Sequence, residues 1–129
     1  MAVFLHSGDY DRVHQGLSIA AAAAAAGRPV EVFWFWWALQ RWARGDLDEP
    51  DFGPAAQGVA DSFERRGAPT LRQLLAHLTE AGGCTFYACT GSMGALDLQA
   101  EGMPAGLDRL VGWSAILQLT AGVTDRFYL

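Results

Sequence analysis

Cys89 is the residue of this sequence best suited to covalent chemistry. It stands between an apolar run, CTFYA, and the polar stretch TGSMG, where a buried strand should give way to a turn or helix. At such a junction, unpaired backbone N–H groups and the dipole of the following helix favour an ionised thiolate. A thiolate is the form of cysteine that attacks sulfur or carries it. Cys89 is therefore a candidate nucleophile, although many free cysteines are simply small buried side chains.

Several residues near Cys89 could assist it. Gly91 lets the backbone approach a ligand closely, and the run Thr90, Gly91 and Ser92 could bind an anion, including a sulfur anion. His6 follows the first apolar run, AVFL, and could hydrogen-bond the Cys89 thiolate if two strands end side by side. A plain structural role for His6 is the competing interpretation.

Cys84 is expected to be a packed thiol and not a partner of Cys89. The two cysteines are five residues apart, so along a strand they lie about 16 Å from each other and on opposite faces. A disulfide needs Cα atoms within about 7 Å, so two free thiols are expected. Together with the cysteines, the histidines His6, His14 and His77 match no zinc-module spacing, so no metal site is predicted.

Five apolar runs alternate with helical segments along the chain. The runs expected to form strands are residues 2–6, 30–35, 84–88, 109–113 and 123–129. The segments expected to form helices are 9–27, 36–44, 55–65, 70–81, 90–98 and 114–122. This alternation predicts a three-layer α/β/α sandwich with a five-stranded, mostly parallel sheet, built by residues 1–129 as a single domain. Ligands bind such sheets beyond the C-terminal ends of the strands, where Cys89 is expected to lie.

Capping residues mark several of the expected helix ends. Asp9 can cap the helix that Gly27 ends, and Thr70 with Gln73 forms a capping-box pattern. Ser114 is the expected cap of the last helix.

Aromatic residues are concentrated between Phe33 and Trp42. Alternation along a strand sends Trp34 and Trp36 to the face opposite Phe33 and Phe35. Because helices cover both faces of a parallel sheet, part of this cluster must be core. The rest could line a pocket or a contact between subunits. The following segment, GDLDEPDFGP, is expected to be an acidic surface loop.

Composition excludes several classes of chemistry. The chain has 129 residues and a net charge of −5, and all nine of its basic residues are arginines. Without lysine there is no Schiff base for pyridoxal phosphate and no Walker A loop, and no GxGxxG motif follows a strand. No cofactor is therefore predicted. No basic cluster exceeds Arg65–Arg66, so direct nucleic-acid binding is not expected.

The hydropathy pattern points away from membranes. The longest apolar runs, residues 19–26 and 32–39, are shorter than the ~18 residues that a membrane span needs. Asp9 and Asp11 interrupt the region in which a signal peptide would be apolar. A cytoplasmic protein without membrane association is expected, and its thiols should be reduced there.

Three segments carry a likeness to a known family. They are the start, AVFLHSGDYDRVHQGLSIAAAAAAAGRPVEVFWF; the stretch FYACTGSMGALDL around Cys89; and the end, VGWSAILQLTAGVTDRFYL. Together they resemble the DsrE/DsrF-like group of small sulfur-relay proteins, which includes the TusD-type sulfur carriers. The resemblance implies a three-layer fold and assembly into homotrimers or homohexamers. It also implies a persulfide on the cysteine that follows the strand, which corresponds to Cys89, and protein partners that donate and accept the sulfur.

Two functions from different classes remain open. One is a sulfur carrier or sulfurtransferase that relays persulfide sulfur on Cys89. The other is a non-catalytic oligomer of the same fold, which binds a small ligand or anion where Trp36, Trp37 and the turn after Cys89 meet the sheet edge. A peroxide-reducing thiol protein is a weaker third candidate, because no resolving cysteine is expected near Cys89.

Overall fold

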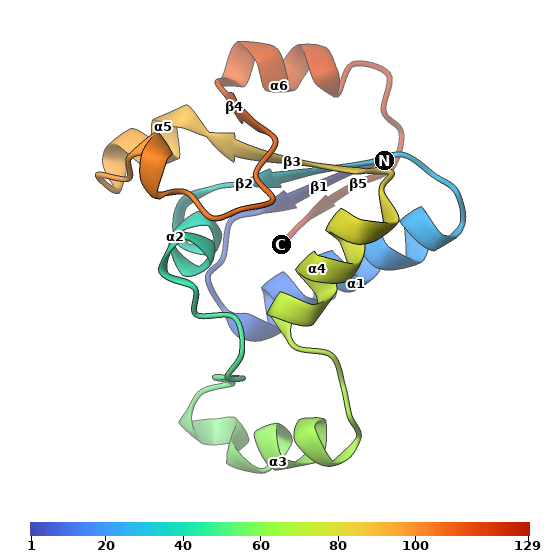
Figure 1. The fold of residues 1–129 in the computed structure, drawn as a ribbon, viewed down its shortest axis with the longest axis vertical. Helices are drawn as coiled ribbons and strands as arrows, with labels where there is room; N and C mark the ends of the chain where they lie inside the picture. Colours follow the sequence, from blue (N-terminus) through green and yellow to red (C-terminus); the bar gives the residue numbers. More distant parts are fainter.

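A single parallel sheet forms the centre of the molecule (Figure 1). The computed structural model describes the backbone of residues 1–129 and their side chains, apart from those of Ala55 and Gln57. The strands are β1 (Ala2–Leu5), β2 (Val30–Trp34), β3 (Cys84–Cys89), β4 (Arg109–Val111) and β5 (Arg126–Tyr128). They lie in the order β4-β3-β2-β1-β5, and each neighbouring pair is parallel. The predicted sheet is thus confirmed, and it is parallel throughout.

Helices cover both faces of this sheet, as the alternating pattern predicts. They are α1 (Tyr10–Ala25), α2 (Trp36–Arg44), α3 (Gln57–Arg65), α4 (Leu71–Ala81), α5 (Thr90–Ala95) and α6 (Trp113–Leu119), with short 3-10 turns at Pro54–Ala56 and Ala100–Gly102. Helices α1 and α4 lie together on one face, and α6 lies on the other (Figure 1). Helices α2 and α5 directly follow β2 and β3, at the edge where these strands end, and α3 projects away from the sheet.

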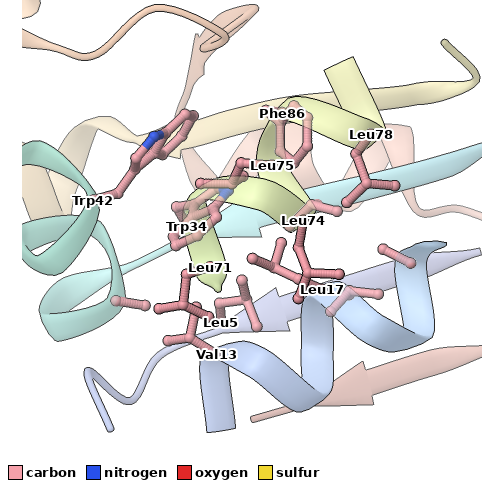
Figure 2. Close-up of a cluster of buried hydrophobic side chains, with 14 of the residues drawn as sticks. Leu5, Val13, Leu17, Trp34, Trp42, Leu71, Leu74, Leu75, Leu78 and Phe86 are labelled. Atoms are coloured by element: carbon pink, nitrogen blue, oxygen red, sulfur yellow. The ribbon is translucent and has the colours of Figure 1, made fainter. Parts of the chain in front are cut away.

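The larger part of the core lies between the sheet and helices α1 and α4 (Figure 2). Helix α4 contributes four buried leucines at helical spacing, namely Leu71, Leu74, Leu75 and Leu78. Each fully buried leucine stabilises the fold by about 1.5–3 kcal/mol relative to an exposed one. The predicted capping box starts this helix: the Gln73 N–H donates to Thr70 Oγ1 at 3.3 Å, and the Thr70 N–H donates to Gln73 Oε1 at 2.9 Å.

Helix α1 packs very closely on the sheet because it presents small residues to it. A Cβ atom built at Gly16 would overlap Leu5 Cδ2 and would meet Val3 Cγ1 at 3.4 Å. Ala20 and Ala23 are buried one and two turns further along the same helix. The alanine-rich run is thus explained by close helix–sheet packing.

Some predicted boundaries are wrong. His6 and Phe35 lie just beyond β1 and β2, and the last strand is limited to Arg126–Tyr128. Helix α6 begins at Trp113 with Gly112 in the capping position, so Ser114 lies inside the helix and does not cap it. Each of these positions depends on where pairing with a neighbouring strand stops, which local propensity does not specify.

Two residues in the turn regions also depart from expectation. Asp9 occupies the capping position of α1, but its carboxylate accepts a hydrogen bond from the Ser7 hydroxyl at 2.8 Å and none from a helix N–H. Trp36 does not continue the alternation of β2, because it is the first residue of α2 and has a φ of +41°.

Candidate functional site

Cys89 is the last residue of β3 and the residue that precedes α5. This is the position predicted from the sequence, at the C-terminal edge of the sheet. Its side chain is only 3% exposed and belongs to the smaller core cluster, on the face that α6 covers. On one side it is paired in register with Val111 of β4. The thiol is therefore at the right edge of the sheet but beneath the molecular surface.

The three residues after Cys89 differ in what they contribute. Gly91 lies near the sulfur, since a Cβ built there would lie 3.8 Å from Cys89 Sγ. The Thr90 hydroxyl donates to the Val111 carbonyl oxygen at 3.4 Å, so it ties the start of α5 to β4. Ser92 is 2% exposed, so its hydroxyl does not face solvent at this edge. Of the predicted anion-binding run, Gly91 is the residue whose missing side chain leaves space beside the sulfur.

His6 is not brought into contact with Cys89. Strand β2 lies between β1 and β3, and Phe35 follows it at the level of both residues. The His6 ring stacks on Phe35, with centroids 4.4 Å apart and planes 4° from parallel. Burial lowers the pKa of His6, so the ring is neutral near pH 7. The possible hydrogen bond between His6 and Cys89 does not occur among the described side chains, so the competing structural role of His6 fits its position better.

A row of stacked aromatic rings underlies α6. Tyr128, Phe4, Phe33 and Tyr87 come from β5, β1, β2 and β3, and their successive ring centroids are 4.6, 5.1 and 4.8 Å apart. One step closer to the C-terminal edge, the corresponding side chains are His6, Phe35 and Cys89. Trp113 of α6 stacks on Phe35 in this second row, at 5.3 Å. The sequence places Trp113 after the fourth strand but gives no sign of this contact, because the contact joins residues 78 positions apart.

Trp36 and Trp37 lie at the same edge and are exposed to 44% and 57%. A bulky residue with a φ of +41° is uncommon and strained, so the backbone at Trp36 is held in place by its surroundings. The loop after β1 packs closely on the next residue, since a Cβ at Gly8 would meet the Trp37 Cβ and carbonyl oxygen at 3.0 Å. Part of the predicted aromatic cluster is therefore surface, while Trp34 and Trp42 pack in the core, 4.7 Å apart.

Cys84 lies at the opposite end of β3 and on the opposite face. It is half-buried against the larger core cluster, and both cysteines are free thiols. Burial and, to a smaller extent, the charge of Asp108 raise the pKa of Cys84 to about 12. The Cys84 thiol therefore remains protonated at neutral pH, as befits the predicted packing role.

The larger hollows of the surface are found elsewhere. One of about 450 Å³ lies between the 48–50 and 60–73 segments, and another of about 600 Å³ adjoins Phe52 and Val59. Neither contains Cys89 or the three residues that follow it. Among the described side chains, no three His, Cys, Asp or Glu residues gather closely enough to hold a metal ion. No helix of the described chain is long and apolar enough to cross a membrane.

Comparison with known proteins supports the architecture. No protein-family model and no curated protein matches the chain. The structure of a protein of unknown function, MTH1491 from Methanobacterium thermoautotrophicum, is similar with a TM-score of 0.59 over 99% of this chain and 96% of that one. The two sequences are 14% identical, so the likeness concerns the fold alone. The chain is thus a three-layer α/β protein with a parallel sheet and a buried cysteine at its C-terminal edge.

Proposed function

We propose that the protein carries sulfur as a persulfide on Cys89. The observation that carries the proposal is the position of this thiol, at the C-terminal edge of a parallel sheet, directly before helix α5 and beside Gly91. The other thiol, Cys84, offers no alternative, because its pKa of about 12 keeps it protonated. The resemblance of the Cys89 segment to sulfur-relay proteins supports the same assignment.

The proposed reaction is two successive thiolate displacements on sulfur. The Cys89 thiolate attacks the outer sulfur of a donor persulfide, R–S–SH. A new S–S bond forms to Cys89, the donor S–S bond breaks, and the electron pair leaves with the donor as its thiolate. An acceptor thiolate then attacks the outer sulfur on Cys89 and releases the Cys89 thiolate. Neither step requires an external oxidant, and both depend on access to the sulfur.

The proposal extends to partners and assembly. Donor and acceptor are thiol-bearing proteins, and the carrier assembles from identical subunits into trimers or hexamers. Two strongly exposed apolar residues beside the α6 face, Leu117 at 66% and Tyr128 at 64%, support assembly. Large exposed apolar side chains are typical of subunit contacts. A reducing cytoplasm would keep Cys89 available for loading.

Intact mass spectrometry tests sulfur loading directly. The reduced protein is incubated with inorganic polysulfide, desalted and weighed, alongside the variants Cys89→Ala and Cys84→Ala. We expect the mass of one sulfur atom on the wild-type chain and on Cys84→Ala, and none on Cys89→Ala. Treatment with dithiothreitol should remove the added mass.

Cys84→Ala is the matched control, because it removes the same functional group from the same strand. Loading that survives in Cys89→Ala and disappears in Cys84→Ala would overturn the assignment. Absence of loading on the wild-type chain would remove the carrier function altogether.

A second candidate is a small-ligand or anion-binding module, and the exposure of Trp36 and Trp37 favours it. Tryptophan faces at a sheet edge can bind a planar small ligand without any role for the thiol. In that case Trp36→Ala would abolish ligand-induced fluorescence changes, while Cys89→Ala would leave them intact. The carrier hypothesis instead expects sulfur loading to be lost in Cys89→Ala and kept in Trp36→Ala.

A further inference from the structure

The chain segment between β4 and α6 begins beside Cys89. Val111, at the end of β4, is paired with Cys89 on one side of β3. Phe35, at the end of β2, lies on the other side of β3 at the same level. The ring of Trp113, two residues after Val111, stacks on Phe35 at 5.3 Å. A segment that is anchored beside Cys89 on the β4 side and reaches Phe35 on the β2 side spans about 10 Å across the end of β3, where the thiol lies.

The side chain of Cys89 is much smaller than the aromatic side chain that β3 contributes to the neighbouring row. In the neighbouring row, all four strands from β5 to β3 contribute an aromatic ring, and β3 contributes Tyr87. Two residues further on, β3 contributes only the small side chain of Cys89. The Trp113 ring stacks on Phe35 beside this small side chain, and Cys89 is 3% exposed in a buried cluster that also contains Val111 and Ile116.

The contacts that hold the Trp113 side chain in place are limited, which a movable side chain requires. Trp113 is itself 54% exposed, and its stacking partner is the single ring of Phe35. Helix α6 contributes only Ile116 to the fully buried core, and its preceding residue, Gly112, makes no side-chain cap. Half-exposed aromatic side chains change rotamer on the picosecond-to-nanosecond scale, without unfolding of the chain.

We propose that Trp113 is a gate over Cys89, which swings away from Phe35 to admit a thiol reagent or partner and closes again over the loaded sulfur. As regulation of the proposed carrier site, this inference rests on the proposed function. Closure would shield a persulfide from water and from small thiols between its two transfers. The stacking of Trp113 on Phe35 sets how often the gate is open.

Alkylation of Cys89 measures the gate without any sulfur chemistry. In a Cys84→Ala background, where Cys89 is the only thiol, the rates with iodoacetamide and with the larger N-(1-pyrenyl)maleimide are followed by mass spectrometry. Trp113→Ala should raise the iodoacetamide rate about threefold to tenfold, the factor that an aromatic pair of this kind is worth. The increase should be larger for the pyrenyl reagent, since a partly open gate obstructs it more.

Trp37→Ala is the matched control, because Trp37 is similarly exposed, at 57%, at the same edge, and the ring nearest to it is Trp36. Its alkylation rates should equal those of the background protein. Trp113→Phe keeps a ring over Phe35 and should restore slow alkylation. If Trp113→Ala does not fold, Trp113→Leu replaces it, since leucine is too short to reach across Cys89.

Three outcomes would overturn the gate. The first is equal alkylation rates in Trp113→Ala and the background. The second is faster alkylation that only parallels a loss of global stability in denaturant. The third is faster alkylation accompanied by a lower molar mass in light scattering, which would assign the cover to a second subunit. Alkylation needs no persulfide, so the two tests are independent. The alkylation rates can support the gate even if polysulfide does not load Cys89, and polysulfide can load Cys89 even if the alkylation rates contradict the gate.

Discussion

At the scale of single residues, two residues matter for the environment of Cys89. Gly91 has no side chain, and Trp113 has a large one. Gly91 lies beside the sulfur on the α5 side, and Trp113 extends towards Phe35 on the α6 side. Gly91 places no side chain on the α5 side of the sulfur, and in the proposed gate Trp113 closes over the sulfur on the α6 side. The reactivity of Cys89 should therefore respond in opposite directions to added bulk at Gly91 and lost bulk at Trp113.

Gly91→Ala should make the protein slightly more stable and its cysteine less reactive. Gly91 has an ordinary helical backbone, so alanine fits there and stabilises the helix by about 0.5–1 kcal/mol. The new methyl group would lie 3.8 Å from Cys89 Sγ, in ordinary contact, and would screen it. We expect a small rise in the midpoint of denaturant unfolding and several-fold slower loading by polysulfide.

Gly94→Ala provides the control for this prediction. It lies in the same helix, and a Cβ there would meet no atom within 4 Å. It should give a comparable gain in stability with unchanged loading. Equal loading rates in the two variants would mean that reagents do not approach the sulfur past Gly91.

At the scale of secondary-structure elements, the position of the site depends on how α1 holds the sheet. β1 and β2 follow one another through α1, and the close approach at Gly16 fixes the height of this helix above Leu5 and Val3. The strand ends that carry His6, Phe35 and the edge around Cys89 are aligned because these parallel strands share one register.

Gly16→Ala should destabilise the protein despite the better helix propensity of alanine. Its Cβ would overlap Leu5 Cδ2, and Leu5 is 1% exposed in a packed core with little room to move. Overpacking of this kind costs about 1–3 kcal/mol, which exceeds the gain of up to about 1 kcal/mol in propensity. Urea unfolding should show a net loss of about 1–2 kcal/mol.

Gly58→Ala, in helix α3, is the comparison variant. A Cβ at this position would meet nothing within 4 Å, so only the propensity gain applies and stability should rise slightly. A stabilised Gly16→Ala variant would mean that the Leu5 side chain yields easily and that close packing of α1 is not required.

At the scale of the whole molecule, the two faces of the sheet are unequally covered. One face carries α1 and α4 over a large apolar cluster, while the other carries the short helix α6 over a smaller one (Figure 1). Exposed apolar side chains accompany the thinner layer, namely Trp113, Leu117 and Tyr128. A subunit contact on this side would complete the covering layer.

Leu117→Gln should therefore shift the assembly state of the protein. Leu117 is 66% exposed, so a polar residue there does not disturb the fold of one chain, but it weakens an apolar contact between chains. We expect a lower molar mass in light scattering, with unchanged circular dichroism. Val59→Gln, which changes an exposed apolar residue on the remote helix α3, should leave the molar mass unchanged. A single-chain mass for the unaltered protein would refute the proposed assembly.

The sequence by itself determined those features whose cause is local. The alternation of apolar runs and helical segments predicted the parallel α/β sandwich. It could do so because the spacing of apolar residues in a helix or a strand follows from the backbone geometry of that element. The capping box of Thr70 and Gln73 is a contact between residues three apart. The place of Cys89 at the end of a strand also follows from the pattern on either side of it.

Only the tertiary structure decided which strand ends meet. The strand order puts β2 between β1 and β3, so Phe35 separates His6 from Cys89. The same order makes β4 the neighbour of β3, so the chain that leaves β4 for α6 starts beside Cys89 and brings Trp113 onto Phe35. Strand order arises from the packing of residues far apart in the chain, and no local periodicity records it. The candidate thiol, Cys89, could therefore be identified from the sequence. The contact between Trp113 and Phe35 could be identified only from the tertiary structure.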